Sequence, residues 1–153
     1  MNMVNKLLTL SHQFRKAIDY IKGARLCMCN SYFDRFPVGC CGDTSDLLAQ
    51  YLYDHGIIAK YVWGTWYGTT SYDSQSHAWL LVNDLIIDIT GDQFRNNRTF
   101  YNFDKQVYVG PINQFYELFE LGPCSVHEYK SGAILTAEQR VIYKKIMECI
   151  NRG

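Results

Sequence analysis

The spacing of apolar residues changes along the chain, from helical to strand-like and back to helical. Apolar residues recur every three or four positions between about residues 5 and 22, which predicts an amphipathic helix that ends near Gly23. A second helical stretch follows Cys41 and ends near Gly56, with acidic and hydroxyl residues crowded into its first turn. The buried face predicted for this helix consists of Leu47, Leu48, Tyr51 and Leu52.

From residue 57 onwards the apolar residues are β-branched and aromatic, which is typical of strands. Residues 57–66 form the first predicted strand. Two short apolar runs, 77–82 and 85–90, are separated by an Asn-Asp pair and predict a β-hairpin. Residues 106–109 are expected to form a further strand.

The last predicted element is a helix that opens with a capping-box pattern, Thr136-Ala137-Glu138-Gln139. Its inward face is expected to contain Val141, Ile142, Ile146 and Ile150. The chain shows no repeats, low-complexity tracts or linkers, so we expect a single domain over residues 1–153. Two helices precede the strands, and this order favours an α+β fold in which a helix packs on an antiparallel β-sheet.

Composition narrows the class of protein. With 153 residues, 48% of them hydrophobic, the chain is long enough for one domain with a sizeable core. Fifteen basic and fifteen acidic residues cancel, so neither nucleic acid nor a membrane surface is an expected partner. No apolar run approaches the ~20 residues of a membrane span, and the N-terminus lacks a signal-peptide pattern. We expect a cytoplasmic protein, although an effector exported by another route would look the same.

The six cysteines are expected to be free thiols, because a disulfide framework is typical of small secreted domains. Four of them lie close together in the sequence: Cys27, Cys29, Cys40 and Cys41. Their spacing does not fit the C-x2-4-C pattern of structural zinc sites, so no metal or cofactor is expected. Cys124 and Cys149 are expected to be structural.

Cys41 stands where a loop turns into a helix, and this position can activate a thiol. A helix N-terminus and a neighbouring imidazole both lower the pKa of a cysteine. The imidazole must come from His12, His55, His77 or His127. His77 is the best candidate, because it opens the first strand of the hairpin whose second strand carries Asp88.

The predicted hairpin register brings His77 and Asp88 together. With the turn at 83–84, the two residues are diagonal neighbours on one face of the sheet, about 7–8 Å apart between Cα atoms. Asp88 lies among isoleucines, where an unpaired carboxylate is costly to bury. A histidine partner relieves that cost and fixes the ring tautomer. The sequence therefore predicts a triad of Cys41 as nucleophile, His77 as base and Asp88 as orienting carboxylate.

Taken singly, each of these residues has a plainer interpretation. Cys41 alone is a packed thiol, His77 a hydrogen-bonded strand histidine and Asp88 a turn residue at a strand end. Their combination, in this order on a helix start and two paired strands, is much less common by chance.

Residues 36–94 resemble the transglutaminase-like branch of the papain-like cysteine proteases. That family shows G-x-C-x-D-x-A, then G-I, then H-A-W, then D-P-T. The corresponding segments here are Gly39-Cys40-Cys41-Gly42-Asp43-Thr44-Ser45, Gly56-Ile57, His77-Ala78-Trp79 and Asp88-Ile89-Thr90. The register of the resemblance selects Cys41 over Cys40, whose role stays open between a decoy, a redox partner and plain packing.

The resemblance implies a papain-like, transglutaminase-like core and a Cys-His-Asp thiol hydrolase or acyltransferase. Such an enzyme acts on amide or peptide bonds through a thioester, as a protease, deamidase or transglutaminase. It implies a protein or peptide substrate, and includes bacterial effector and toxin domains. The alternatives are acyl transfer of the arylamine N-acetyltransferase type, or a non-catalytic binding protein that retains the fold.

Two features of the predicted site stay open. The N–H of Cys41 is one oxyanion donor, whereas the position of papain's glutamine falls on Arg35, and Asn30 is an alternative second donor. Asp92 and Gln93 either cap the strand end or touch substrate. Four aromatic residues beside the loop at 68–76 line either a substrate cleft or the core: Trp63, Trp66, Tyr67 and Tyr72.

Overall fold

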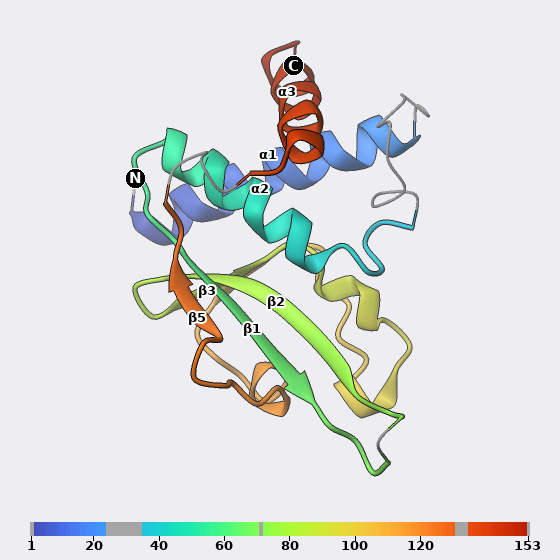
Figure 1. The fold of residues 1–153 in the computed structure, drawn as a ribbon. Coiled ribbons are helices and arrows are strands. Elements are labelled where there is room, and N and C mark those ends of the chain that lie inside the picture. Colours follow the sequence, from blue (N-terminus) through green and yellow to red (C-terminus); the bar gives the residue numbers. More distant parts are fainter. Residues whose placement is uncertain (1, 24–34, 71, 131–134, 153) are drawn as a thin grey trace.

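The computed structural model describes residues 2–23, 35–70, 72–130 and 135–152. Over this part of the chain it contains three α-helices and one five-stranded antiparallel sheet, so the predicted α+β class is confirmed (Figure 1). The elements are α1 (Met3–Gly23), α2 (Cys41–Asp54), β1 (Lys60–Trp66), β2 (Gln75–Val82), β3 (Leu85–Asp88), β4 (Tyr108–Gly110), β5 (Val126–Glu128) and α3 (Ala137–Arg152). None of the described helices combines the length and apolar character that a membrane span requires.

The ends of the helices follow the predicted signals. Gly56 adopts a positive φ of 79° after α2, which is the left-handed conformation that glycine tolerates at a helix end. The capping box of α3 is confirmed, because Thr136 and Gln139 exchange hydrogen bonds of 2.9 and 3.0 Å between side chain and backbone. The inward face of α3 was predicted partly wrongly: Ile142 and Ile146 are buried, but Val141 is 48% exposed.

The sheet has the strand order β4-β3-β2-β1-β5, with every neighbouring pair antiparallel. The hairpin register is confirmed, since Val82 pairs with Leu85 and Leu80 with Ile87. Pairing of β2 with β3 stops there, and β3 itself ends at Asp88 rather than at the predicted residue 90. The two strands therefore separate beside the residues that carry the candidate chemistry.

The three helices lie on one side of the sheet (Figure 1). The core on this side is mainly aliphatic and includes residues from all three helices and from alternate positions of the strands. Its fully buried members include Leu7, Phe14, Ile18, Leu47, Leu52, Leu80, Ile142 and Ile146. Burial of this apolar area, at roughly 25 cal/mol per Å², is the main stabilising contribution to the fold.

The opposite face of the sheet carries a mainly aromatic core. Its members are Val62, Trp79, Ile86, Phe94, Phe100, Phe115, Tyr116 and Phe119. The segment that supplies the last three residues packs closely on the sheet at Gly64, where an added Cβ would stand 2.9 Å from Phe119 and 3.0 Å from a backbone oxygen. Gly64 is the cross-strand partner of His77. The segment that contains Phe119 therefore packs on the sheet beside the candidate histidine.

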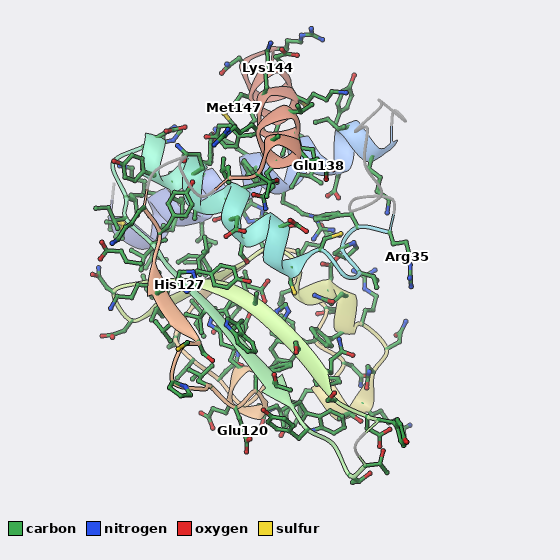
Figure 2. The ribbon with its side chains drawn as sticks, viewed as in Figure 1. Arg35, Glu120, His127, Glu138, Lys144 and Met147 are labelled. Atoms are coloured by element: carbon green, nitrogen blue, oxygen red, sulfur yellow. The ribbon has the colours of Figure 1, made fainter. Side chains whose placement is uncertain are left out.

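The covering segment and α3 lie at different ends of the molecule. Figure 2 shows Lys144 and Met147 on α3 at one end and Glu120, which directly follows the aromatic core segment, at the other. Lys144 and Met147 of α3 are therefore remote from the aromatic face.

Candidate active site

Cys41 is the first residue of α2, and the loop before it fixes that position. Gly39 has a positive φ of 73°, and the carbonyl of Cys40 accepts the N–H of Thr44 to begin the helix. The residue before the helix makes no side-chain cap. The positive end of the helix dipole favours negative charge at the first turn of α2, next to the Cys41 thiol.

The two adjacent thiols have different surroundings. Cys40 is 0% exposed, belongs to the aliphatic core and donates to the carbonyl of Val38 at 3.3 Å. Burial, together with the charge of Asp43, raises the pKa of Cys40 to about 11. Burial also opposes ionisation of Cys41, but hydrogen bonding and charge from His77 and the N–H of Ala78 outweigh it and lower the pKa of Cys41.

His77 and Asp88 form a buried pair. Nε2 of His77 lies 2.7 Å from Oδ2 of Asp88, and both side chains are withdrawn from solvent. Burial disfavours the imidazolium, but the charge and hydrogen bond of Asp88, with a further contribution from Cys41, raise the pKa of His77 to about 9. Burial likewise raises the pKa of Asp88, and His77 with the other donors more than reverses this, so that Asp88 is ionised.

Donors from Thr90 and Tyr116 also hold the Asp88 carboxylate. The N–H of Thr90 donates to Oδ1 at 2.9 Å, and the hydroxyl of Tyr116 donates to Oδ2 at 2.9 Å. Because an ionised carboxylate only accepts, Nε2 of His77 carries a proton and Nδ1 is the ring atom available to a thiol. Tyr116 was not identified in the sequence, where it stands in an aromatic-rich segment with no motif to separate it from its neighbours.

Cys41 approaches His77 where β2 and β3 separate. Since the pairing of these strands ends at Leu80, the N–H of Ala78 is free to donate to the thiol of Cys41 rather than to β3. A nucleophile on the helical side of the sheet and a base on the aromatic side thus meet at the gap in the sheet.

Aromatic rings surround the imidazole of His77. Phe94 packs edge-on at 5.0 Å between ring centroids, and further rings lie within 5.6 to 6.5 Å: Trp79, Phe115, Tyr116 and Phe119. Such surroundings exclude water and strengthen the electrostatic interactions between thiol, imidazole and carboxylate.

The 3₁₀ turn Gly91–Phe94 adds a further polar group to the site. Nε2 of Gln93 lies 3.2 Å from Nδ1 of His77, and the adjacent Asp92 forms a two-pronged ion pair of 2.8 and 2.9 Å with Arg15 of α1. The sequence left Asp92 and Gln93 open between capping the strand end and touching substrate. In the structure, Asp92 ties the turn to α1, and Gln93 faces the histidine.

The other predicted candidates make other contacts, are exposed or partly buried, or fall outside the described residues. Nδ1 of His55 lies 2.8 Å from a carbonyl of its own helix, and His127 stacks on Tyr61. Cys124 is exposed rather than packed, and Cys149 is partly buried. Cys27, Cys29 and Asn30 fall outside the described residues. Within the described ranges, no group of three or more His, Cys, Asp or Glu residues is arranged to hold a metal ion.

The aromatic residues beside the loop at 68–76 divide into two kinds. Trp66 packs edge-on against Phe100 and belongs to the covering of the aromatic core. Trp63 is 41% exposed and is the cross-strand partner of Ala78, whose N–H reaches Cys41. Tyr67 and Tyr72 are exposed. Trp63 is therefore the partly exposed aromatic residue that lies opposite Ala78 on the sheet.

Comparison of the chain with models of protein families, with curated proteins and with solved structures gives no match. The function of the site therefore has to be inferred from its own geometry and chemistry.

Proposed function

We propose that the protein is a cysteine-dependent acyl-transfer enzyme with a transglutaminase-like, papain-like core, in which Cys41, His77 and Asp88 form the triad. The observation that carries this proposal is the pairing of Cys41 at a helix start with an imidazole whose other nitrogen is held at 2.7 Å by a buried carboxylate. A nucleophile, a base and an orienting group in hydrogen-bonding sequence are the requirements for nucleophilic catalysis by a thiol.

The proposed reaction begins when Nδ1 of His77 takes the proton of the Cys41 thiol. The thiolate attacks the carbonyl carbon of an amide, a C–S bond forms, and the carbonyl oxygen becomes an oxyanion. The C–N bond then breaks, the leaving amine takes the proton from the imidazolium, and a thioester remains on Cys41. Water, deprotonated by His77, cleaves the thioester and regenerates the thiol; an amine in place of water gives transamidation.

The start of α2 supplies the electrostatic stabilisation that this reaction needs. The backbone N–H of Cys41 is the proposed donor to the oxyanion, and the positive end of the helix dipole favours the negative charge that develops there. Asp88 keeps the imidazole in the tautomer in which Nδ1 carries a lone pair, and it stabilises the imidazolium.

The substrate class that we propose is a protein or peptide carboxamide. Trp63 offers an exposed aromatic surface opposite Ala78, whose N–H donates to the thiol, and aromatic surfaces of this kind anchor polypeptide side chains. Hydrolysis, giving proteolysis or deamidation, is the preferred outcome because water needs no second binding site.

The proposal is tested by incubating a cell lysate with wild-type protein and, in parallel, with Cys41→Ala. Mass spectrometry is expected to find new peptide termini or the mass shift of deamidation only with the wild type. Consumption of an acyl thioester cofactor in place of these changes would point to the N-acetyltransferase-type alternative. If no product of any kind depends on Cys41, the protein is a binding protein that retains the fold.

A further inference from the structure

Gln93 makes a contact that the triad chemistry leaves unexplained. Its side-chain nitrogen Nε2 lies 3.2 Å from Nδ1 of His77, the atom that has to take the proton of Cys41. The same Nε2 lies 3.1 Å from the carbonyl oxygen of Thr90. Two partners around one amide nitrogen define its orientation.

The carbonyl of Thr90 fixes which end of the Gln93 amide faces the histidine. A carbonyl oxygen only accepts hydrogen bonds, so the group beside it has to be the NH₂ and not the amide oxygen. The NH₂ of Gln93 therefore donates to Nδ1 of His77, which requires a lone pair on that nitrogen. A protonated Nδ1 would place an N–H against another N–H.

The turn that carries Gln93 is held in place from α1. Arg15 contacts both carboxylate oxygens of Asp92, at 2.8 and 2.9 Å, and donates to the carbonyl of Ile89 at 2.8 Å. Arg15 and Asp92 are both buried. The buried ion pair between Arg15 and Asp92 thus fixes the turn that carries Gln93. The contact of Gln93 with His77 is therefore part of the folded structure.

We propose that Gln93 is a positioning residue whose NH₂ stabilises the neutral, Nε2-protonated form of the His77 imidazole and so weakens, without preventing, formation of the thiolate–imidazolium pair. This inference rests on the proposed function, since it concerns the same thiol and base. An amide carbonyl bound at the thiol supplies a new acceptor for the Gln93 NH₂. When the NH₂ turns to that acceptor, its opposition is removed and the thiolate–imidazolium pair is favoured further.

Gln93 acts against the other charged and titratable groups that face His77. Asp88 from β3 and the thiol of Cys41 from α2 favour the imidazolium, whereas the hydroxyl of Tyr116 reaches the ring only through Asp88. The remaining neighbours of the ring are apolar aromatics. Gln93 is therefore an uncharged group whose contact with the ring favours the neutral form, against the larger effect of Asp88 and Cys41.

The test is the pH dependence of Cys41 alkylation by iodoacetamide in the wild type and in Gln93→Met, which keeps the length of the side chain and removes the donor. A lost hydrogen bond of about 0.5–1.5 kcal/mol corresponds to roughly half to one pH unit. We expect the midpoint of Cys41 reactivity to move to lower pH by that amount. Gln114→Met, at an exposed glutamine, is the matched control and should leave the midpoint unchanged.

A second measurement keeps the thiol out of the comparison. In a Cys41→Ala background, NMR titration of the His77 ring should give a higher pKa with Gln93→Met than with Gln93, by the same half to one unit. An unchanged or lowered His77 pKa, or a midpoint of Cys41 alkylation that stays or moves to higher pH, overturns the inference. If His77→Ala leaves Cys41 reactivity unchanged, the proposed function fails instead, so the two failures are distinguishable.

Discussion

The two faces of the sheet are built for different purposes. The face beneath α1, α2 and α3 is mainly aliphatic, whereas the opposite face is aromatic and encloses the His77–Asp88 pair. Aliphatic burial stabilises a fold without any polar partner, but a buried charged pair loses hydration that its mutual attraction only partly restores. The polar pair is therefore better explained by chemistry than by stability, and the aliphatic face carries most of the folding energy.

The doubled cysteine spans these two regions. Cys40 packs in the aliphatic core with a raised pKa, and Cys41, one residue later, reaches the polar pair on the aromatic side with a lowered pKa. Cys40 and Cys41 are chemically identical, so the difference between their expected roles comes from their surroundings.

The largest effect is expected from exchanging the two cysteines for alanine in turn. Cys41→Ala should abolish acyl transfer and leave the melting temperature close to wild type, because its side chain lies at a helix edge. Cys40→Ala should keep activity and lose about 1 kcal/mol of unfolding free energy, as expected for a truncated core residue. Lysate assays and thermal melts check both; the reverse pattern would make Cys40 the nucleophile.

The next largest effect is expected from Asp88→Asn. An amide can hold the His77 ring in the wrong tautomer and cannot stabilise an imidazolium, so turnover should fall by roughly 10²–10⁴-fold with the fold retained. Asp84→Asn, in the exposed hairpin turn, is the control and should keep wild-type turnover. Near-wild-type activity in Asp88→Asn with normal thermal stability would remove Asp88 from the triad.

On the aliphatic face, Ile146→Ala in α3 is expected to act on stability alone. Ile146 is fully buried, so its truncation should lower the free energy of unfolding by about 2–5 kcal/mol. Val141→Ala, at the exposed neighbour on the same helix, should change it by less than about 0.5 kcal/mol. Urea unfolding measures both. A selective loss of Cys41 alkylation in the folded Ile146 variant would contradict the separation of the two faces.

A smaller, pH-dependent effect is expected from Tyr116→Phe on the aromatic face. The Tyr116 hydroxyl stabilises the ionised form of Asp88, whose pKa lies below its ordinary value of 3.8. The stabilisation is therefore present above that value and is lost as the pH falls through the lower pKa of the folded state. Urea unfolding should show a deficit of about 1–2 kcal/mol at neutral pH that shrinks in acid. A deficit independent of pH would assign Tyr116 to packing only.

Local patterns in the sequence were enough to predict much of the fold. The helical period located α1, the turn at 83–84 fixed the hairpin register, and the capping box of α3 formed as expected. These features depend on residues close together in the chain. The strand β5 was missed because its three residues are all exposed and so show no alternation between apolar and polar positions.

The candidate site was predictable only in its central residues. The register of one hairpin brings His77 to Asp88, so this contact follows from the sequence. Tyr116 and Gln93 reach the same two side chains from a 3₁₀ turn far along the chain and from the turn after β3. Arg15 comes from a helix whose spacing predicts only its apolar face. Contacts between segments that lie far apart in the sequence cannot be predicted from the local pattern of either segment.

The most direct test of the central claim is the alkylation rate of each of the six cysteines, followed by mass spectrometry across pH in wild type and His77→Ala. The lowered pKa of Cys41 means that its reactive thiolate persists below the ordinary value of 9.0 and is lost as the pH falls through the pKa of the folded state. We predict that Cys41 of the wild type reacts at least about tenfold faster than the other thiols at neutral pH, equivalent to a pKa difference of about one unit. In His77→Ala that selectivity should disappear. Slow, uniform labelling of all six thiols, or a selectivity that survives the loss of His77, would contradict the account.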